Sequence, residues 1–461
     1  MDDCGCNTFV LFNSHFNSLF YFLFNSRNLN NNMIKTPVKG MPEQMPADME
    51  IREYALRLIK ETYGNFGFSL IETPVIEHIE NLTNKQGGEN ESLIFKILKR
   101  GEKLKEAESG ERRTENGERR TEIGEQLCDS GLRYDLTVPL SRFFVNNQNL
   151  LPYPFKALQI GSSFRADKPQ KGRFRQFTQC DIDIIGDGSN LAEIELISAT
   201  AEMLHRLGMG NFKIRVNDRR ILKAMSAACG FPQDRFDDIC IILDKLDKIG
   251  VEGVAEQLHG MSLSEEGIAK YSAMLAEGTD FETSKAFTDK HLAGTLDPAI
   301  ADNMETIISC VRSIVEGKGG IVFDPSLVRG MGYYTGPIFE IELIDKKNYS
   351  FSIAGGGRYD EMIGKFSDGK IMAPACGFSI GFERIVTILK DKGFKVERKG
   401  ESVAYLLRAG LPAERIREVI VEVNRLRDEG NRVLISPRAK NIKAQIEKLE
   451  EYGYTKIVKI D

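Results

Sequence analysis

The chain contains no tryptophan, and only 5 of its 461 residues are histidine and 15 are proline. Its 8 cysteines are scattered and include no CxxC pair, which argues against a structural zinc site or a dense disulfide framework. Positive charge is not in excess either, since 62 Lys and Arg face 67 Asp and Glu. A uniformly basic nucleic-acid-binding surface is therefore excluded, although a local basic patch is not. The cysteine usage fits a reducing compartment, so we expect a cytoplasmic protein.

A long apolar run is also missing. The most apolar stretch, residues 9–24, is interrupted by Asn and Ser, and the chain begins with Met-Asp-Asp instead of the basic start of a signal peptide. An Asn-rich stretch follows at 28–32. We predict that residues 1–32 add nothing to the fold and that Met33 is the natural start. The alternative is a genuine but disordered extension. No membrane association is expected.

The composition that is present, 41% hydrophobic and 28% charged residues, is that of a globular protein with two to three domains. Apolar residues at helical spacing predict a helix from Pro46 to about Gly64, followed by a strand at 68–76. Pro74 places that strand at an edge or an interface. Further strands are predicted around 155–164, 175–185, 338–344, 350–354 and 375–380. This pattern predicts an α+β fold, an antiparallel sheet with helices on one side.

Three segments depart from this pattern. Residues 101–126 contain a tandem Gly-Glu-Arg-Arg-Thr-Glu repeat without apolar residues, which predicts a charged, solvated loop; nucleic-acid contact by its Arg pairs is the less favoured alternative. From about 220 to 315 the pattern is almost wholly helical and indicates an inserted helical module. Residues 401–461 alternate strand and helix, which predicts a small α/β domain with parallel strands behind a main domain at 33–400.

Polar side chains that a plain core would avoid gather in residues 164–183. Arg165 and Arg173 flank a Pro/Gly turn there, and a guanidinium fork matches phosphate oxygens. Along the following arm an aromatic ring, an amide and two carboxylates alternate and so share one sheet face: Phe177, Gln179, Asp181 and Asp183. Such a face suits an amino-acid or nucleotide pocket. A charged, exposed hairpin is the plainer interpretation.

Two more segments combine glycine with polar residues. Residues 327–340 hold Arg329, Tyr333 and Tyr334 among glycines, and the glycine-rich turn at 354–360 allows a close approach to a ligand. In residues 377–385 a strand runs into a helix, with Arg384 near the helix start, where it could clamp a phosphate. The GxxxxGK[ST] phosphate loop is absent. Taken singly, the tyrosines also fit core packing and Arg384 also fits a surface position.

Together these segments resemble the class II aminoacyl-tRNA synthetases, and among them the histidyl-tRNA synthetase family. Phe-Arg at 164–165 and Gly-Phe-Glu-Arg at 381–384 are similar to motifs 2 and 3 of that class. The helix from Pro46 and the strand with Pro74 are similar to motif 1, which usually builds the dimer. The histidine-specific patterns are matched at 132–139, 329–336 and 355–360. The resemblance covers residues 33–461.

The resemblance implies a role for each matching residue. The histidine α-ammonium is held by Asp135, Thr137 and Gln179, the imidazole nitrogens by Asp183 and Tyr334, and Tyr333 lines the pocket. In the ATP site, Arg165 and Arg384 bind phosphates, Arg173 lies near them, Phe177 stacks on adenine, and Arg329 binds the α-phosphate in place of a catalytic metal contact. No metal site built by the chain is implied.

The implied activity is that of a histidine–tRNA ligase. L-histidine reacts with ATP, accompanied by Mg²⁺, to give histidyl-adenylate and pyrophosphate, and the histidine then passes to the 3′ end of tRNA(His). A homodimer is expected. The alternative is a non-enzymatic, synthetase-like regulatory protein that senses histidine in histidine biosynthesis. Such proteins lack the anticodon-binding domain, whereas Arg165, Arg329, Arg384 and a C-terminal α/β domain are present here, which favours the enzyme.

The sequence departs from the family's pattern at three places. Gly332 stands where the family has Asp, which removes a charge beside Arg329, and Asp167 stands where the family has Glu. The family's anticodon-binding domain continues past the strand at 455–460. We therefore expect a shortened domain, with tRNA recognition more affected than amino-acid activation.

Overall fold

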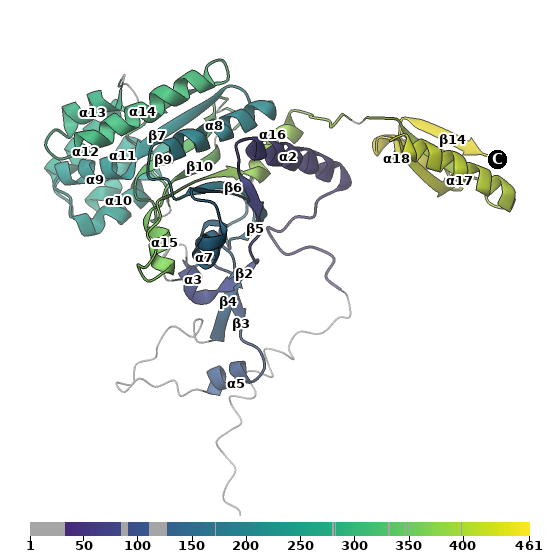
Figure 1. Cartoon of the computed structure of the whole chain (residues 1–461), viewed down its shortest axis with the longest axis horizontal. Helices are drawn as coiled ribbons and strands as arrows, with labels where there is room; N and C mark the ends of the chain where they lie inside the picture. The colour runs from purple at the N-terminus through teal and green to yellow at the C-terminus, as the bar shows by residue number, and fades with distance from the viewer. Residues whose placement is uncertain are drawn as a thin grey trace, which may run out of the picture.

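The computed structural model describes residues 33–83, 91–109, 127–170, 172–278, 281, 283–330, 332–345, 347–349, 351–397 and 399–461. The predictions made for the leader at 1–32 and for the repeat within 110–126 lie outside the described residues. Figure 1 shows a sheet with flanking helices, a helical module at one end, and a separate C-terminal domain. None of the helices in these ranges is both long and apolar enough to cross a membrane.

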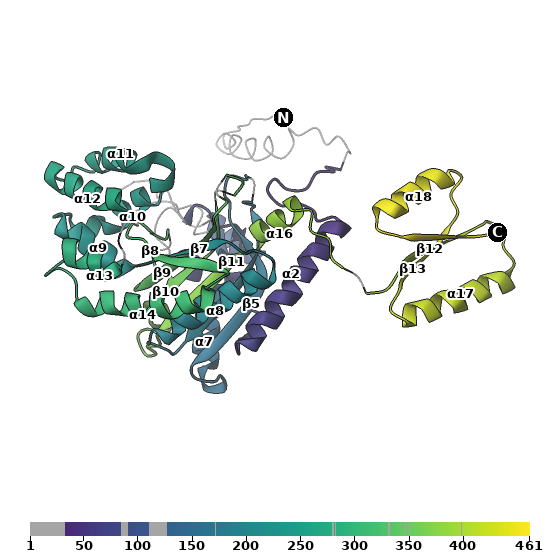
Figure 2. The same ribbon diagram turned by 90° about the horizontal axis from the view of Figure 1, so that it is seen from above.

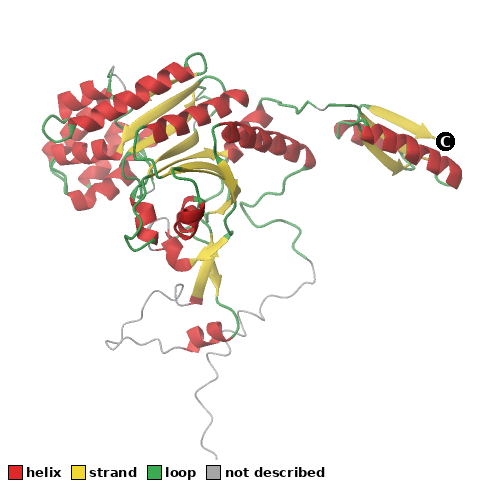
Figure 3. Cartoon of the chain, viewed as in Figure 1, coloured by secondary structure: helices red, strands yellow, loops and turns green. Residues whose placement is uncertain are grey.

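The central sheet has the order β1-β5-β6-β11-β10-β9-β7-β8. Its strands are β1 (Ser69–Ile71), β5 (Phe155–Phe164), β6 (Gln176–Ile185), β7 (Phe212–Asp218), β8 (Gly319–Phe323), β9 (Pro337–Leu343), β10 (Ser352–Arg358) and β11 (Ala375–Gly381). From β5 to β7 all neighbours are antiparallel, and only the outer pairs β1–β5 and β7–β8 are parallel. The predicted antiparallel α+β architecture is confirmed (Figure 3).

Helices cover one face of this sheet. There α2 (Pro46–Asn65), α8 (Leu191–Arg206) and α14 (Pro298–Val315) lie side by side, with α16 (Phe382–Asp391) next to α2 (Figure 2). On β6, Cys180, Ile182 and Ile184 belong to the hydrophobic core beneath α8. Because side chains alternate along a strand, the polar residues between them face the other side of the sheet. The functional residues of β6 are therefore turned away from the helices.

One prediction around the first strand needs correction. The single strand expected at 68–76 is two short strands, β1 and β2 (Ile76–His78), with Pro74 between them. Pro74 has no N–H for a strand ladder, and the carbonyl of Thr73 accepts a hydrogen bond from Arg133 Nη1 at 2.7 Å instead. The chain thereby passes into a second, antiparallel sheet of order β2-β4-β3, made with β3 (Lys96–Leu98) and β4 (Cys128–Leu132).

The charged segment at 101–126 does not begin as a loop. Residues Glu102–Ser109 form α5, because Glu, Lys, Leu and Ala favour helix and Glu102 lies in the first turn, where the helix dipole stabilises it. The domain that holds the central sheet also contains the shorter helices α3 (Ile79–Thr83), α7 (Thr137–Asn147), η1 (Gln148–Leu150) and α15 (Glu361–Phe366). Of these, α7 and α15 pack against each other.

The glycine-rich stretch at 354–360 is a strand, not the predicted turn. Gly355, Gly356 and Gly357 lie in β10, between β9 and β11. A Cβ atom on Gly356 would lie 2.0 Å from the carbonyl oxygen of Gly377, and one on Gly357 would lie 2.7 Å from that of Pro337. The neighbouring strands approach so closely that only glycine fits, and this contact is not visible in the strand propensities of the sequence.

Helices fill the stretch predicted to be a helical module. After β7 come α9 (Arg219–Ala228), η2 (Gln233–Arg235), α10 (Phe236–Leu243), α11 (Leu246–His259), α12 (Glu265–Glu277), α13 (Ser284–His291) and then α14. Helix α11 is kinked at Gly250, which has a φ of +69°. Its first turn is thereby separated from the rest.

The C-terminal domain has the predicted β-α-β-α-β order, with β12 (Ser402–Leu407), α17 (Ala413–Asp428), β13 (Arg432–Pro437), α18 (Ile442–Glu451) and β14 (Lys456–Ile460). The strands are parallel in the order β13-β12-β14. The domain has its own hydrophobic core, made of Val403, Tyr405, Val419, Val423, Val433 and Ile460.

Candidate active site

A cavity of about 830 Å³ lies on the sheet face turned away from α8. It is lined by β6, β10 and β11, by the start of α7, by the Arg329–Tyr334 segment and by the connection from α10 to α11. Every residue to which the resemblance assigns a role lines this one cavity: Asp135, Thr137, Arg165, Arg173, Phe177, Gln179, Asp183, Arg329, Tyr333, Tyr334 and Arg384. Segments more than 200 positions apart in the sequence thus meet at one place.

Asp183 lies at the buried end of the cavity. Its Oδ1 accepts a hydrogen bond of 2.6 Å from the Tyr359 hydroxyl, while its Oδ2 has no partner within the described chain. A Cβ atom on the facing Gly377 would lie 2.0 Å from Oδ1, so a glycine makes room for this carboxylate. Burial raises the pKa of Asp183 to about 7, although the Tyr359 hydrogen bond lowers it. One oxygen is therefore left for a donor from a ligand.

The Gln179 amide has a fixed orientation. Its Nε2 donates to Asp181 Oδ2 at 3.2 Å and to Ser379 Oγ at 3.3 Å, and Ser379 in turn donates to Asp181. The other end of the amide, Oε1, is buried and finds no donor among the residues described. Burial, with the nearby Asp183, raises the pKa of Asp181 well above its usual range. The amide therefore presents a carbonyl acceptor to the cavity.

Asp135 sits at the start of α7. Its Oδ1 accepts a hydrogen bond from the backbone N–H of Val138 at 3.0 Å, and its buried Oδ2 has no partner in the described ranges. Burial raises its pKa. Thr137 is the first residue of the helix. Asp135 thus supplies a third oxygen acceptor close to the two on β6.

Tyr333 and Tyr334 are buried, with their ring centroids 4.8 Å apart, and both rings reach the cavity. The Tyr333 ring also lies 6.0 Å from that of Tyr359. Core packing and cavity lining, which the sequence left as alternatives, therefore both apply to these two residues.

Arginines surround the other end of the cavity. The Arg165 guanidinium lies 4.2 Å from the Tyr134 ring centroid and 5.2 Å from that of Phe177, and its Nε donates to the Tyr134 carbonyl at 3.1 Å. Arg173 makes two 3.0 Å hydrogen bonds to Asp167, the residue that stands where the family has Glu. These contacts orient both guanidinium groups beside the cavity.

Arg384 donates to the backbone carbonyl of Ser352 at 2.5 Å. Burial lowers its pKa, and the positive charges of Arg173, Arg329 and Arg165 act in the same direction, opposed by Glu340. Such mutual repulsion between cations is relieved by an anion placed among them. This end of the cavity is therefore suited to phosphate.

Arg329 projects over β10, where Gly355 leaves room for it: a Cβ atom there would lie 2.5 Å from Arg329 Nη1. Nη1 makes an ion pair of 2.7 Å with Glu340 Oε2, and the buried Nε is unpartnered as far as the structure describes the chain. Burial would lower the pKa of Arg329, but Tyr334 and Glu340 raise it. The carboxylate beside Arg329 is thus Glu340, although position 332 holds a glycine.

Some residues of the site were not identified from the sequence. Tyr359 and Ser379 touch the carboxylates described above, and Glu383 is bound by Arg52 of α2 through hydrogen bonds of 2.6 and 2.9 Å. The strand alternation that grouped the polar residues of β6 would also have placed Ser379 on the cavity side of β11. Nothing in the sequence pattern indicates the Arg52–Glu383 pair, because it joins helices 331 positions apart.

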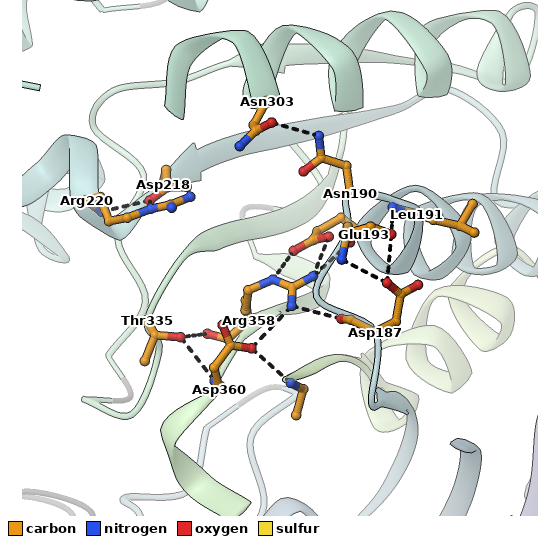
Figure 4. Close-up of polar contacts among 12 residues, drawn as sticks. Asp187, Asn190, Leu191, Glu193, Asp218, Arg220, Asn303, Thr335, Arg358 and Asp360 are labelled. Carbon is orange, nitrogen blue, oxygen red and sulfur yellow. Dashed lines mark hydrogen bonds and ion pairs between the residues drawn. The ribbon is translucent and has the colours of Figure 1, made fainter. Parts of the chain in front are cut away.

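Arg358, in the same glycine-rich segment, does not line the cavity but belongs to a network of polar contacts (Figure 4). It makes hydrogen bonds of 2.6 and 2.8 Å to Glu193 of α8 and bonds the carbonyl oxygens of Asp187 and Ser189. Asp360 accepts from Arg358 at 3.2 Å and from the Ala375 backbone at 2.9 Å. These bonds fasten the end of β10 to α8 and so hold the neighbouring Tyr359 in place.

Within the described ranges, no group of three or more His, Cys, Asp and Glu side chains is arranged to hold a metal ion. Three carboxylates at the arginine end, Asp167, Glu340 and Glu383, each accept hydrogen bonds from an arginine. These three carboxylates are therefore engaged with arginines instead of being grouped for a cation.

Comparison with known proteins agrees with this site. The histidyl-tRNA synthetase family model matches residues 125–385. The chain is 42% identical over 436 residues to a histidine–tRNA ligase of Leifsonia xyli, covering 92% of this chain and 95% of that one. It is 32% identical over 409 residues to a histidine–tRNA ligase of Cytophaga hutchinsonii, covering 88% of each.

Solved structures share the fold. A histidyl-tRNA synthetase from Nostoc sp. PCC 7120 has a TM-score of 0.70 at 24% identity, covering 92% of this chain and 90% of that one. An ATP phosphoribosyltransferase regulatory subunit/histidyl-tRNA synthetase from Bacillus halodurans has a TM-score of 0.70 at 20% identity, covering 93% and 99%. With the family model spanning more than half of the chain and the Leifsonia ligase aligned over nearly all of it, the chain belongs to the histidyl-tRNA synthetase family of class II aminoacyl-tRNA synthetases.

Proposed function

We propose that this chain is a histidine–tRNA ligase that forms histidyl-adenylate from L-histidine and ATP and then charges tRNA(His). The observation that carries the proposal is a group of buried polar atoms without partners in the described cavity: Asp135 Oδ2, Gln179 Oε1, Asp183 Oδ2 and Arg329 Nε. Buried polar groups are normally hydrogen-bonded, so such a group favours a ligand that supplies the missing bonds. The three oxygen acceptors suit the cationic ammonium end of an amino acid. The Arg329 donor suits an anionic carboxylate or phosphate beside it.

At the acceptor end we place the histidine. Asp135, Thr137 and Gln179 bind the α-ammonium, and Asp183 and Tyr334 bind the two imidazole nitrogens, with Tyr333 at the side of the ring. The fixed Gln179 amide and the free oxygens of Asp135 and Asp183 support this orientation. A pocket that bonds both ring nitrogens selects histidine, because a ring without them leaves buried polar groups unpaired.

At the arginine end we place ATP. Arg165 and Arg384 bind its phosphates with Arg173 nearby, Phe177 stacks on adenine, and Arg329 contacts the α-phosphate. The histidine carboxylate is already ionised, so its attack on the α-phosphorus needs no general base. One oxygen–phosphorus bond forms while the bond to the β-phosphate oxygen breaks, and pyrophosphate leaves. Catalysis then rests on in-line placement and on arginine charges that meet the developing negative charge.

In the second step, a terminal ribose hydroxyl of the tRNA attacks the adenylate carbonyl carbon and AMP leaves. The C-terminal domain at 401–461 is the part of the chain we assign to the anticodon. Mg²⁺ is proposed to arrive with ATP, because Glu340 and Glu383 are paired with arginines and do not fit a protein-built Mg²⁺ site. No step above depends on it.

A cytoplasmic homodimer is proposed as the working form. Near Pro74, Leu70, Val75 and Ile76 expose apolar side chains at the edges of two sheets. Exposed apolar side chains at unpaired strand edges favour burial against a second copy. Light scattering of the purified protein tests the dimer, and a monomeric mass would contradict it.

The test of the function is histidine-dependent exchange of pyrophosphate into ATP, followed by charging of tRNA(His). We expect both activities, with exchange absent when histidine is replaced by another amino acid. A protein that binds histidine without any exchange would instead be the regulatory alternative. The family membership and the intact arginine set favour the enzyme.

A further inference from the structure

A second ion cluster lies directly behind Arg329. At its centre is Arg215 of β7, whose side chain is 9% exposed and whose Nε lies 2.6 Å from Asp324 Oδ2. Its Nη1 lies within reach of three more carboxylates, at 3.3 Å from Asp247, 3.8 Å from Glu340 and 4.0 Å from Glu342. Arg215 and Glu340 are register partners on the adjacent strands β7 and β9. The cluster is thus built on the sheet that carries the cavity.

Glu340 joins this cluster to the active site. Its Oε2 pairs with Arg329 Nη1 at 2.7 Å, while its Oε1 faces Arg215 Nη1 at 3.8 Å. One carboxylate is therefore shared unequally between two guanidinium groups, with the shorter contact going to Arg329. Because Coulomb attraction rises as the distance falls, an Arg215 guanidinium closer to Glu340 would compete with Arg329 for this carboxylate.

Asp324 holds Arg215 Nε, while Asp247 is the nearest of the three carboxylates that share Arg215 Nη1 and so competes with Glu340 for that nitrogen. Asp247 belongs to the helical module, in the first turn of α11, before the kink at Gly250. The same short segment forms one wall of the cavity through Ile241, Asp244, Lys245 and Lys248. The segment at 241–248 therefore contributes both to this wall of the cavity and to the ion partners of Arg215.

We propose that Arg215 and Glu340 are positioning residues for Arg329, and that Asp247 couples the seating of the helical module to the alignment of that arginine. The inference rests on the proposed function, in which Arg329 acts on the α-phosphate. When the first turn of α11 is in place, Asp247 engages Arg215, and the shorter contact of Glu340 goes to Arg329. When that turn is displaced, Arg215 competes for Glu340 and Arg329 loses its alignment.

The test is Asp247→Asn, with Asp237→Asn as the matched control. Asp247 is 70% exposed and pairs with the buried Arg215, while Asp237 is 73% exposed and pairs with Arg219, which is 8% exposed. Both aspartates belong to the helical module, but only Asp247 connects to Arg329. The loss of an exposed ion pair changes an equilibrium constant only a few-fold. Asp247→Asn should therefore lower the kcat of pyrophosphate exchange about two- to five-fold. The KM values for histidine and ATP should stay within about two-fold, and Asp237→Asn should match the parent.

A double-mutant cycle separates coupling from a general loss of stability. In a Glu340→Gln background the link to Arg329 is already broken, so adding Asp247→Asn should lower kcat no further. Arg215→Lys, which keeps the charge but loses the fork, should lower kcat as well. Equal effects of Asp247→Asn and Asp237→Asn, an unchanged kcat, or additive effects in the Glu340→Gln background would overturn the proposal. Parent exchange is measured first; its absence would overturn the proposed function and this inference with it.

Discussion

Two buried strands, β6 of the large sheet and β12 of the C-terminal domain, show how differently the two regions use their interiors. On β6, Gln179, Asp181 and Asp183 face the cavity while the residues between them enter the core. On β12, every residue from Ser402 to Leu406 is buried, and α17 and α18 cover opposite faces of its sheet (Figure 2). A parallel sheet covered on both faces leaves neither face open to a small molecule. The large sheet thus has a cavity on one face, whereas both faces of the C-terminal sheet are covered; in the proposed function the cavity takes the small substrates and the outer surface of the C-terminal domain faces the tRNA.

The strongest test of this comparison changes one arginine in each region. Arg329 and Arg438 each have a buried Nε without a partner in the described chain. Arg329→Ala should lower the kcat of adenylate formation about 10²- to 10³-fold, because a preorganised charge-stabilising donor is lost. Arg329→Lys should recover only part of this rate, since lysine keeps the charge without the fork. Arg438→Ala should leave pyrophosphate exchange unchanged.

Calorimetry of histidine binding completes that test, because binding should change far less than rate in Arg329→Ala. If the variant melts earlier and loses binding and rate together, the ion pair with Glu340 is only structural.

The next largest effect is expected at the acceptor end of the cavity. Asp183→Ala removes the acceptor proposed for an imidazole N–H, and a buried unpaired polar group costs about 1–3 kcal/mol. The histidine KM should therefore rise about ten-fold or more, while the ATP KM moves little. Steady-state exchange kinetics with each substrate varied in turn provide the measurement, and an unchanged histidine KM would remove Asp183 from the pocket.

Packing in the large sheet can be tested with a pair of strand glycines. Gly356→Ala would place a methyl group 2.0 Å from the Gly377 carbonyl oxygen, whereas a Cβ atom on Gly320 of β8 would have no neighbour within 4 Å. Overpacking of this kind costs about 1–3 kcal/mol of unfolding free energy. Urea denaturation should show that loss for Gly356→Ala and little change for Gly320→Ala. Similar midpoints for both variants would contradict the close contact of β10 with β11.

A smaller effect is expected from Tyr359→Phe. The Tyr359 hydroxyl favours the ionised form of Asp183, so its removal raises the pKa of Asp183 beyond its present value of about 7. Asp183 accepts an N–H bond well only when ionised, so histidine affinity falls as the pH drops through that pKa. The acid side of the kcat/KM profile should therefore lie at higher pH in the variant. The titration of free histidine is common to both proteins, so coinciding profiles would argue against this role.

The smallest effect on histidine activation is expected from the deletion of the whole C-terminal domain. Deletion of residues 401–461 should spare pyrophosphate exchange, because that domain has its own hydrophobic core, and should weaken the charging of tRNA(His). Parallel assays of the two activities on one preparation give the answer. Loss of both to the same extent would mean that the domain supports the catalytic core or the dimer.

The sequence predicted side-chain positions that follow from the alternation along a single strand. It did not predict positions that depend on contacts between segments far apart in the chain. The alternation of Gln179, Asp181 and Asp183 placed these side chains on one sheet face, where they lie. The sequence pattern singled out Arg165, Arg173, Arg329 and Arg384, the family resemblance gave them roles, and all four line the cavity. Gly356 was expected in a turn, because only the Gly377 carbonyl on the next strand explains a glycine within β10. Likewise, Pro74 predicted an edge but not the passage of the chain from one sheet to another.

The pair between Arg52 and Glu383 also has a consequence for folding during translation. It closes a separation of 331 positions, and Glu383 further accepts a hydrogen bond from the backbone of Thr178 on β6. A ribosome adds about 5–20 residues per second, so α2 emerges tens of seconds before its partner is synthesised. During that interval the apolar side of α2 has no α16 to pack against. The Arg52–Glu383 pair can therefore form only after Glu383 has been synthesised, whereas the contact of α2 with α8 can form earlier.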